Sequence, residues 1–169
     1  SDASIRAVFI KDSPASHIYI NEVCASNQTG ARDEYGQHED WMEIYNDNDF
    51  DVNLAGWYVS DSVAQPTKFQ IPSGTPEQTT VRAKSFLIIW CDGDTRQGPL
   101  HSNFKLRKEG ENLCLSQRID EAIHVVDSFS IEDGKTKSCI AAIRAITDAA
   151  KVLIVAPKFD DKTLLAHRN

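Results

Sequence analysis

The sequence predicts an all-β protein, organised as a β-sandwich or barrel, and two observations support this fold class. Short segments with the side-chain alternation of strands recur along residues 18–129. Clusters of Gly, Pro, Asn, Asp and Ser separate these segments at intervals of about ten residues. We expect about eight to ten short strands. They form a single domain over residues 17–169, and residues 1–16 form an N-terminal arm or an extra edge strand.

Each strand is predicted from its side-chain pattern and from the turn residues that end it. In DWMEIYN, residues 40–46, Met42 and Ile44 alternate with the other side chains, which is the period of a half-buried strand. Residues 46–49 form a turn, because Asn and Asp side chains bond to their own backbone. Residues 86–90 are continuously apolar, which predicts a central strand buried on both faces. The predicted strands are residues 18–23, 41–45, 52–54, 57–60, 68–71, 86–90, 103–106, 112–115 and 123–129, with a hairpin turn at residues 108–111.

The pattern changes in the C-terminal tail, residues 134–169. Isoleucines recur at helical spacing among alanines, which predicts a short amphipathic helix over residues 138–150. Residues 152–155 are apolar and mostly β-branched, so we expect a strand there, ended by Pro157.

The composition is that of a soluble globular domain. Hydrophobic residues make up 41% of the 169, and the net charge is -7. No stretch reaches the roughly 18–20 apolar residues of a membrane-spanning helix, and the first ten residues lack the pattern of a signal peptide. The acidic charge disfavours nucleic acid and anionic membranes as partners. A local basic patch around residues 105–108 stays open as an exception.

The four cysteines are Cys24, Cys91, Cys114 and Cys139, and they are widely spaced. No CxxC pair occurs, so a zinc ribbon and a CxxC redox motif are excluded. We interpret the cysteines as small buried hydrophobic residues on strands. One disulfide, such as Cys24 with Cys114, is the alternative, and it requires neighbouring strands with suitable Cβ geometry. The cysteines alone do not define the redox compartment.

Several short motifs follow one another in the order of a known family. These are INEV and SN at residues 20–27, DW and EIYN at residues 40–46, LAGWY and SD at residues 54–61, the apolar strand at residues 86–90, H-x-NFKL and GE at residues 101–111, and VDSF at residues 126–129. Together they resemble the lamin-tail domain family, in particular its bacterial branch, over about residues 18–129.

The resemblance implies an immunoglobulin-like β-sandwich without catalytic residues of its own. In nuclear lamins this domain is the globular tail that contacts other proteins and chromatin. Bacterial members are similar modules appended to secreted or surface proteins, so the resemblance implies an extracellular, cell-surface or periplasmic location. No heptad rod is present, so a filament role is not supported. Residues 138–144 depart from the family pattern, which leaves the register of the last strand open.

Sequence motifs of enzymes are absent. There is no GxSxG elbow, HExxH motif, Walker loop or GxGxxG fingerprint. The five histidines, all far apart in the sequence, are His17, His38, His101, His124 and His167. We interpret His101, in the segment PLHSN, as a loop histidine that bonds to backbone and fixes a turn. A ligand contact or a general base is the alternative. We assign no catalytic residue and no cofactor.

Carboxylates are the other candidates for chemistry. Glu22 and Glu43 lie on predicted strands, and such a pair could perform acid–base work on a sugar. We interpret them as side chains that bond to backbone or face solvent. Residues 33–40 form an oxygen-rich loop, but they lack the EF-hand pattern of a calcium site. Residues 92–94 (DGD) are interpreted as a turn rather than an ion site. We assign no metal ligand.

The three tryptophans could stack on a carbohydrate or pack in the core. We expect Trp57 and Trp90 in the core, and Trp41 as the most exposed of the three.

The sequence therefore predicts a non-catalytic binding or structural module. The resemblance implies the role of an attachment or protein-interaction domain of a secreted or surface bacterial protein, with a protein or cell-surface partner. Loops carry recognition in such sandwiches, and we expect it in residues 28–39 and 92–103. The alternatives are a carbohydrate-binding module, which requires coplanar exposed aromatic side chains, and an accessory domain of a secreted nuclease or phosphoesterase. An enzyme domain would require a pocket with converging carboxylates or histidines.

Overall fold

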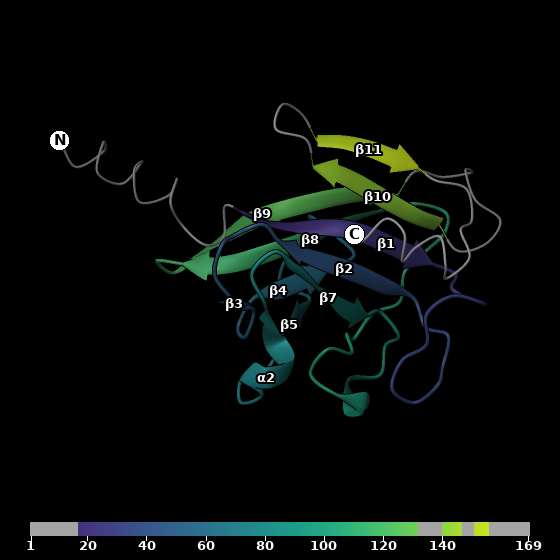
Figure 1. Cartoon of the computed structure of the whole chain (residues 1–169), viewed down its shortest axis with the longest axis horizontal. Helices are drawn as coiled ribbons and strands as arrows, with labels where there is room; N and C mark the ends of the chain where they lie inside the picture. The colour runs from purple at the N-terminus through teal and green to yellow at the C-terminus, as the bar shows by residue number, and fades with distance from the viewer. Residues whose placement is uncertain (1–16, 132–139, 147–150, 156–169) are drawn as a thin grey trace.

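Two β-sheets pack face to face in the computed structural model, which describes residues 17–131, 140–146 and 151–155 (Figure 1). One sheet has five strands in the order β11-β10-β1-β2-β7, and the other has four in the order β5-β4-β8-β9. A two-stranded sheet, β3-β6, completes the set. The elements are β1 (Ile18–Ala25), β2 (Trp41–Asn46), β3 (Val52–Asn53), β4 (Tyr58–Ser60), β5 (Phe69–Gln70), α2 (Pro76–Thr79), β6 (Thr80–Val81), β7 (Ser85–Trp90), η2 (Thr95–Gln97), β8 (Glu111–Ile119), β9 (Ala122–Ile131), β10 (Ile140–Ile146) and β11 (Lys151–Val155). All sheet pairs are antiparallel, which confirms the all-β prediction and is consistent with an immunoglobulin-like sandwich.

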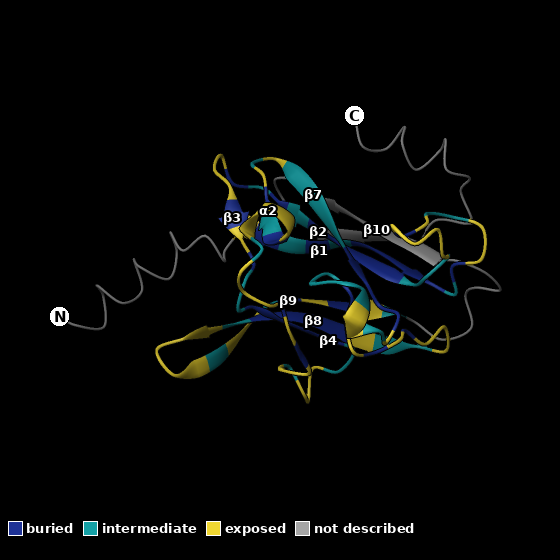
Figure 2. Cartoon of the chain, turned by 90° about the horizontal axis from the view of Figure 1, so that it is seen from below, coloured by how far each residue is buried: buried dark blue, intermediate teal, exposed yellow. Residues whose placement is uncertain are grey.

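The hydrophobic core lies between the two sheets. Ile20 and Ile44 enter it from β1 and β2, and Leu113 and Leu115 enter it from β8. Figure 2 shows the two layers lying against each other, with buried residues in the strands of both. Burial of each such side chain contributes about 1.5–3 kcal/mol. The alternation read from the sequence therefore sorts core-facing from outward-facing side chains correctly on these strands.

A buried hydrogen bond crosses the core between the two sheets. The carboxylate of Asp127 on β9 accepts the N–H of Ile20 on β1 at 2.8 Å. The register of β1 against β2 shifts between Ile20 and Glu22, and that of β8 against β9 shifts between Leu115 and Ser116. A bulge leaves a backbone group without its partner in the β-ladder. In this structure the carboxylate of Asp127 accepts the hydrogen bond from the N–H of Ile20.

The predicted helix over residues 138–150 is wrong where the structure describes this segment. Residues 140–146 form strand β10, which pairs with β1 on one side and β11 on the other. Helix propensity of alanine is a weak preference that tertiary pairing overrides. The predicted strand at residues 152–155 is confirmed as β11. The predicted arm, residues 1–16, lies outside the described residues.

Two further expectations are corrected. Strand β7 was expected at the centre of a sheet, but it lies at an edge of the five-stranded sheet. Residues 103–106 are not a ladder strand, so residues 108–111 are not a hairpin turn between two strands. Phe104 and Leu106 are buried in the core, which explains the alternating pattern. This segment has a single isolated bridge, between Lys105 and Asp92.

Across the described ranges, none of the helices is both long and apolar enough to cross a membrane.

Candidate functional site

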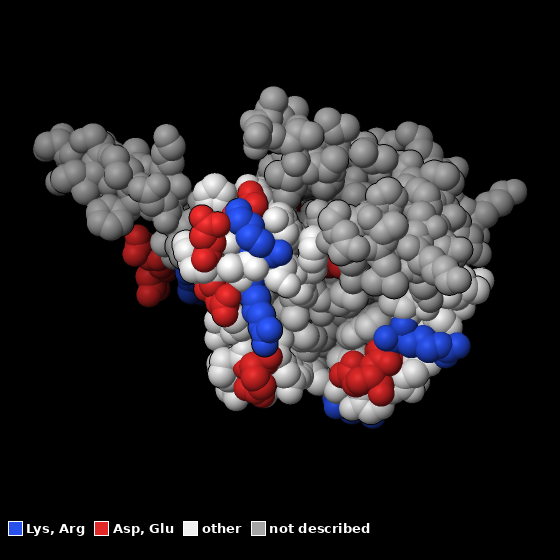
Figure 3. Space-filling model, viewed as in Figure 1, with Lys and Arg blue, Asp and Glu red and all other residues white. Residues whose placement is uncertain are grey.

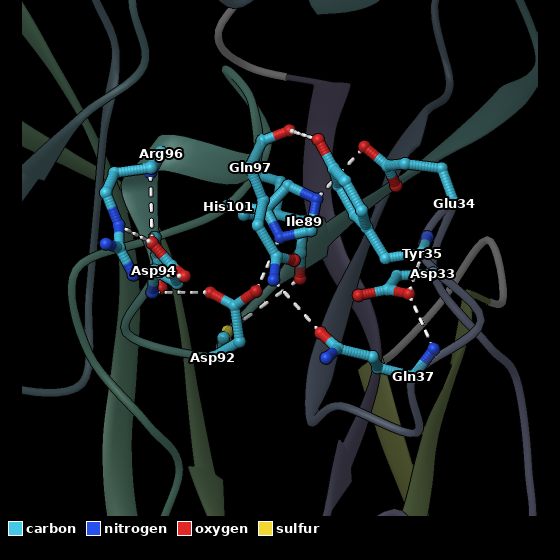
Figure 4. A network of polar contacts seen from close by, with 12 residues as sticks. Asp33, Glu34, Tyr35, Gln37, Ile89, Asp92, Asp94, Arg96, Gln97 and His101 are labelled. Carbon is cyan, nitrogen blue, oxygen red and sulfur yellow. Dashed lines mark hydrogen bonds and ion pairs between the residues drawn. The ribbon is translucent and has the colours of Figure 1, made fainter.

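A buried histidine joins the two loops in which recognition was expected, residues 28–39 and 92–103 (Figure 4). The side chain of His101 is only 1% exposed. Its Nδ1 lies 2.5 Å from Oδ2 of Asp92, and its Nε2 lies 3.1 Å from Oε1 of Glu34. Carboxylates accept hydrogen bonds at both ring nitrogens, which is the pattern of a protonated imidazolium. The ring of His101 thus bonds to carboxylates of both loops rather than to backbone, and a role as a ligand contact or general base stays a prediction.

The edge of strand β7 positions this histidine. The N–H of Trp90 donates to the carbonyl of Leu100, and the N–H of Ser102 donates to the carbonyl of Trp90, both at 2.8 Å. These bonds hold residues 100–102 against the last residue of β7. The imidazole of His101 stacks on the indole of Trp90, with ring centroids 6.5 Å apart. The position of β7 at the sheet edge therefore creates the place where His101 sits.

Asp92 and Asp33 are oriented by their own loops. Oδ1 of Asp92 accepts the N–H of Asp94 at 2.9 Å. Oδ1 of Asp33 accepts the N–H groups of Tyr35 and Gln37 at 2.9 and 2.7 Å. These are side-chain-to-backbone turns typical of aspartate. Each turn uses one carboxylate oxygen and directs the other toward the space between the loops.

Three further contacts link the loops near their tips. The hydroxyl of Tyr35 donates to the carbonyl of Gln97 at 3.0 Å, and Nε2 of Gln97 donates to Oε1 of Gln37 at 3.0 Å. The ring of Tyr35 meets the ring of His101 edge to face, with centroids 6.2 Å apart. Tyr35 nevertheless remains 58% exposed. The linked loops therefore present one large aromatic side chain to solvent in a fixed position.

The electrostatics of the cluster follow from this arrangement. Burial lowers the pKa of His101, but its hydrogen bonds to Asp92 and Glu34 outweigh burial, so its pKa is raised above the ordinary value. Burial raises the pKa of Asp40 and of Glu39 in the neighbouring loop. These shifts favour the positively charged form of His101 and disfavour the negatively charged forms of Glu39 and Asp40.

The other predicted candidates lie elsewhere in the fold. Glu22 and Glu43 are directly opposite each other on β1 and β2, and both are buried. Asn21 donates from Nδ2 to Oε1 of Glu43 at 3.2 Å. His17 and His124 are exposed, and His38 is half-buried. His167 lies outside the described residues.

All three tryptophans are buried, so the expectation that Trp41 is partly exposed is wrong. Trp41 is 1% exposed and packs with Cys24 and Trp90 on the other face of the five-stranded sheet. Trp57 lies in the main core, as expected. A carbohydrate platform built from these three side chains is therefore wrong as well.

The cysteines divide into two kinds. Cys91 and Cys114 are free and buried, and burial raises the pKa of both thiols. Cys24 is disulfide-bonded, so its suggested pairing with Cys114 is wrong. Cys139 lies outside the described residues.

A hollow of about 420 Å³ lies on the four-stranded side, lined by residues that include Asp61, Lys68, Arg107 and Glu111. Its carboxylates face cations, because Lys68 lies 2.7 Å from Asp61 and Arg107 lies 3.7 Å from Glu111. No histidine lines it. The carboxylates of Asp61 and Glu111 in this hollow are therefore paired with cations.

Surface charges are mixed on the face shown in Figure 3, where Lys and Arg atoms lie beside Asp and Glu atoms. Ion pairs of this kind are Lys68–Asp61, Lys84–Asp47 and Arg96–Asp94. The described part of this face has no continuous basic stripe. The expectation that nucleic acid is not a general partner stays a prediction.

Comparisons with known proteins give one match over most of the chain. The family model described as Lamin Tail Domain matches residues 11–135. The large ribosomal subunit protein uL4 of Campylobacter lari is 38% identical over 89 residues, and that of Frankia casuarinae is 32% identical over 105 residues. These matches cover 48% and 57% of this chain but only 43% and 41% of the ribosomal proteins. The ribosomal likeness is thus partial, and it assigns no activity to this chain. No solved structure matches the chain.

Proposed function

The chain belongs to the lamin tail domain family, and from this premise we propose that it is a non-catalytic binding module. Its role is that of an attachment or protein-interaction domain of a secreted or surface bacterial protein. The observation that carries the proposal is the pair of cross-linked loops, 28–39 and 92–103, with Tyr35 exposed at their tip. Loops held rigid before binding lose less conformational freedom in the complex.

Tyr35 suits a protein partner. Tyrosine is enriched among the residues that dominate interface energetics, because it combines a large apolar surface with a hydrogen-bonding group. Its neighbours Glu34 and Arg32 are exposed and of opposite charge, as expected of the polar rim around an interface centre. The partner class that fits is a protein or another polymer on the cell surface.

Two features of the described residues support a role without catalysis. The side chain of His101 is 1% exposed and both of its ring nitrogens bond to carboxylates, so a substrate has no direct access to it. The thiols of Cys91 and Cys114 are buried with raised pKa, which disfavours the reactive thiolate.

The disulfide at Cys24 supports the proposed location. Disulfides persist mainly in oxidising compartments, such as the periplasm and the cell exterior. The proposal of an extracellular, surface or periplasmic module therefore rests on the family and on this bond.

A cell-binding experiment tests the proposal. The fluorescently labelled chain is incubated with intact bacterial cells, with protease-treated cells and with purified peptidoglycan, and bound label is measured. We expect binding to intact cells that protease treatment removes, and binding at least about tenfold weaker for Tyr35→Ala, as for an interface anchor. Phe50→Ala is the matched control, because Phe50 is also an exposed aromatic residue (51%) but lies in the β2–β3 turn. Absence of binding, or equal binding by wild type and Tyr35→Ala, would refute the proposal.

A further inference from the structure

A buried carboxylate oxygen in the loop cluster has no hydrogen-bond partner. Asp33 is 7% exposed, and its Oδ1 takes both hydrogen bonds from its own loop. Its Oδ2 is buried and accepts none. Buried polar atoms are nearly always satisfied, so one without a protein partner indicates a position where a water or an ion binds. Burying this oxygen without a partner costs more free energy than burying a neutral oxygen, because it belongs to a carboxylate.

The orphaned oxygen faces two other groups that bind metals. Asp33, Asp92 and His101 each offer one ligand atom, and these atoms all lie within 4.8 Å of one another. Figure 4 shows the free oxygen of Asp33 pointing into the space between the loops, toward Asp92 and His101. Oε1 of Gln97 is a second buried oxygen without a partner at the same loop junction. Ligand groups from both loops therefore converge on one buried point.

We propose that Asp33, Asp92 and His101 form a binding site for a divalent transition-metal ion of the zinc class, which clamps loop 28–39 to loop 92–103. This inference does not rest on the proposed function, because metal binding by the two loops and binding of a partner are measured in separate experiments.

The donor set selects this class of ion. One imidazole nitrogen and two carboxylates are ligands that zinc accepts, and zinc sites with three protein ligands keep a fourth position for water. Calcium and magnesium prefer sites made entirely of oxygen. Two carboxylates also balance the charge of a divalent ion. A single imidazole with two carboxylates therefore favours zinc and its neighbours over the hard cations.

His101 already has the outer contact that a metal-bound histidine normally makes. A ligating imidazole usually donates its second N–H to a carboxylate, which fixes the ring. Nε2 of His101 faces Glu34 in this way, which leaves Nδ1 for the ion beside Asp92. The ion replaces the proton shared by Nδ1 and Asp92, so binding releases that proton.

Only small movements are needed to admit the ion. A tetrahedral ion with bonds of about 2.1 Å holds its ligand atoms about 3.4 Å apart. The contact of Nδ1 with Asp92, now 2.5 Å, must open, and the widest separation in the cluster, up to 4.8 Å, must close. Both changes are on the order of 1 Å at loop positions.

The test is a metal titration of the full chain. The protein is prepared without a histidine tag, and bound metal is removed with EDTA. We expect calorimetry to show one Zn²⁺ bound per chain and the thermal midpoint to rise with Zn²⁺. We expect Co²⁺ to give the visible absorption of a tetrahedral nitrogen–oxygen site. Calcium at the same concentration should leave the midpoint unchanged. Failure to bind Zn²⁺, or an equal rise with Ca²⁺, would overturn the inference.

Two matched variants locate the ion. Asp33→Asn keeps the Oδ1 acceptor for the loop amides, so the loop keeps its turn, but it removes the charged orphan oxygen. We expect its Zn²⁺ affinity to fall at least about tenfold, the lower end of the loss seen even for outer-shell groups. Asp94→Asn removes a nearby carboxylate that pairs with Arg96 instead, and it should bind Zn²⁺ like the wild type. Equal affinity of wild type and Asp33→Asn would place the ion elsewhere and overturn the assignment. Tyr35→Ala, which tests the proposed function, should bind Zn²⁺ normally.

Discussion

Replacing Asp92 with Asn measures how strongly the buried histidine holds the two loops together in the metal-free protein. The side chains of Asp92 and His101 are 2% and 1% exposed, and their contact is 2.5 Å long. Asparagine keeps the size of the side chain and an oxygen for the N–H of Asp94, but it removes the charge opposite the imidazolium. Hydrogen bonds to charged groups contribute about 1.5–3 kcal/mol, and solvent screening does not reduce this for a buried pair.

We therefore expect Asp92→Asn to lower the free energy of unfolding by about 1.5–3 kcal/mol. For a chain of this size, each kcal/mol moves the thermal midpoint by roughly 2–4 °C, so the midpoint should fall by roughly 3–12 °C. Circular dichroism with EDTA present measures both, by heating and by urea titration at pH 6. Asp94→Asn is the control, because the Asp94 side chain pairs at the surface with the 89% exposed Arg96, and it should change the midpoint far less.

The pH dependence gives this prediction a second readout. The pKa of His101 in the folded chain lies above its ordinary value of 6.5, because Asp92 and Glu34 bond to the imidazole. Asp33 belongs to the same cluster, and the charge of Asp94 also interacts with that of His101. Stability from a raised histidine pKa is fully present below the unfolded value and is lost as pH rises through the folded value. The difference between wild type and Asp92→Asn should therefore shrink as pH rises above 6.5. A midpoint equal to wild type at pH 6, or a loss no larger than that of Asp94→Asn, would refute the reasoning.

Three other predictions concern parts of the fold around the site. Asp127→Ala leaves the N–H of Ile20 buried without this acceptor and should lower the free energy of unfolding by about 1.5–3 kcal/mol in urea titration, whereas Asp127→Asn should lose less; equal losses would contradict the role of the oxygen. Gly98 has φ 152° and ψ 178°, a region nearly restricted to glycine, so Gly98→Ala should cost about 1–3 kcal/mol in thermal unfolding, and an unchanged midpoint would show the reasoning wrong. Reduction with dithiothreitol should lower the stability of wild type by about 2–4 kcal/mol and leave Cys24→Ser unaffected; a wild type indifferent to reductant argues against the bond.

Local patterns were enough to predict most strands and the core side chains that they bury. The period-two alternation in β2 places Ile44 inward, as found. The pattern gives a wrong prediction where side chains pack in the core but their backbone does not pair with another strand. Phe104 and Leu106 alternate with polar residues because they fill the core from an extended segment, which needs no ladder partner. Likewise, residues 140–146 have a helical repeat of isoleucines, but they form a strand because they pair with β1.

The candidate site was predictable only in its parts. The sequence singled out His101, the acidic run with Asp33 and the DGD turn with Asp92 as separate features. Glu34 and His101 are 67 residues apart, and a single sequence gives no distance between such segments. Their meeting depends on the pairing of β2 with β7 at the sheet edge. The nearest signal was that recognition was expected in both loops, residues 28–39 and 92–103.

The bond from Asp127 to Ile20 has a consequence for how the chain selects its fold. Strands with one buried face are specified by register, because a slip of one residue turns every side chain to the opposite face. A buried carboxylate adds a second free-energy penalty. If the strand slipped, the charge of Asp127 would stay buried without the N–H group that donates a hydrogen bond to it. The bulges at Ile20–Glu22 and Leu115–Ser116 fix where that amide is available. Asp127 thus helps to set how the two sheets align, because only the native register brings its carboxylate to the N–H of Ile20.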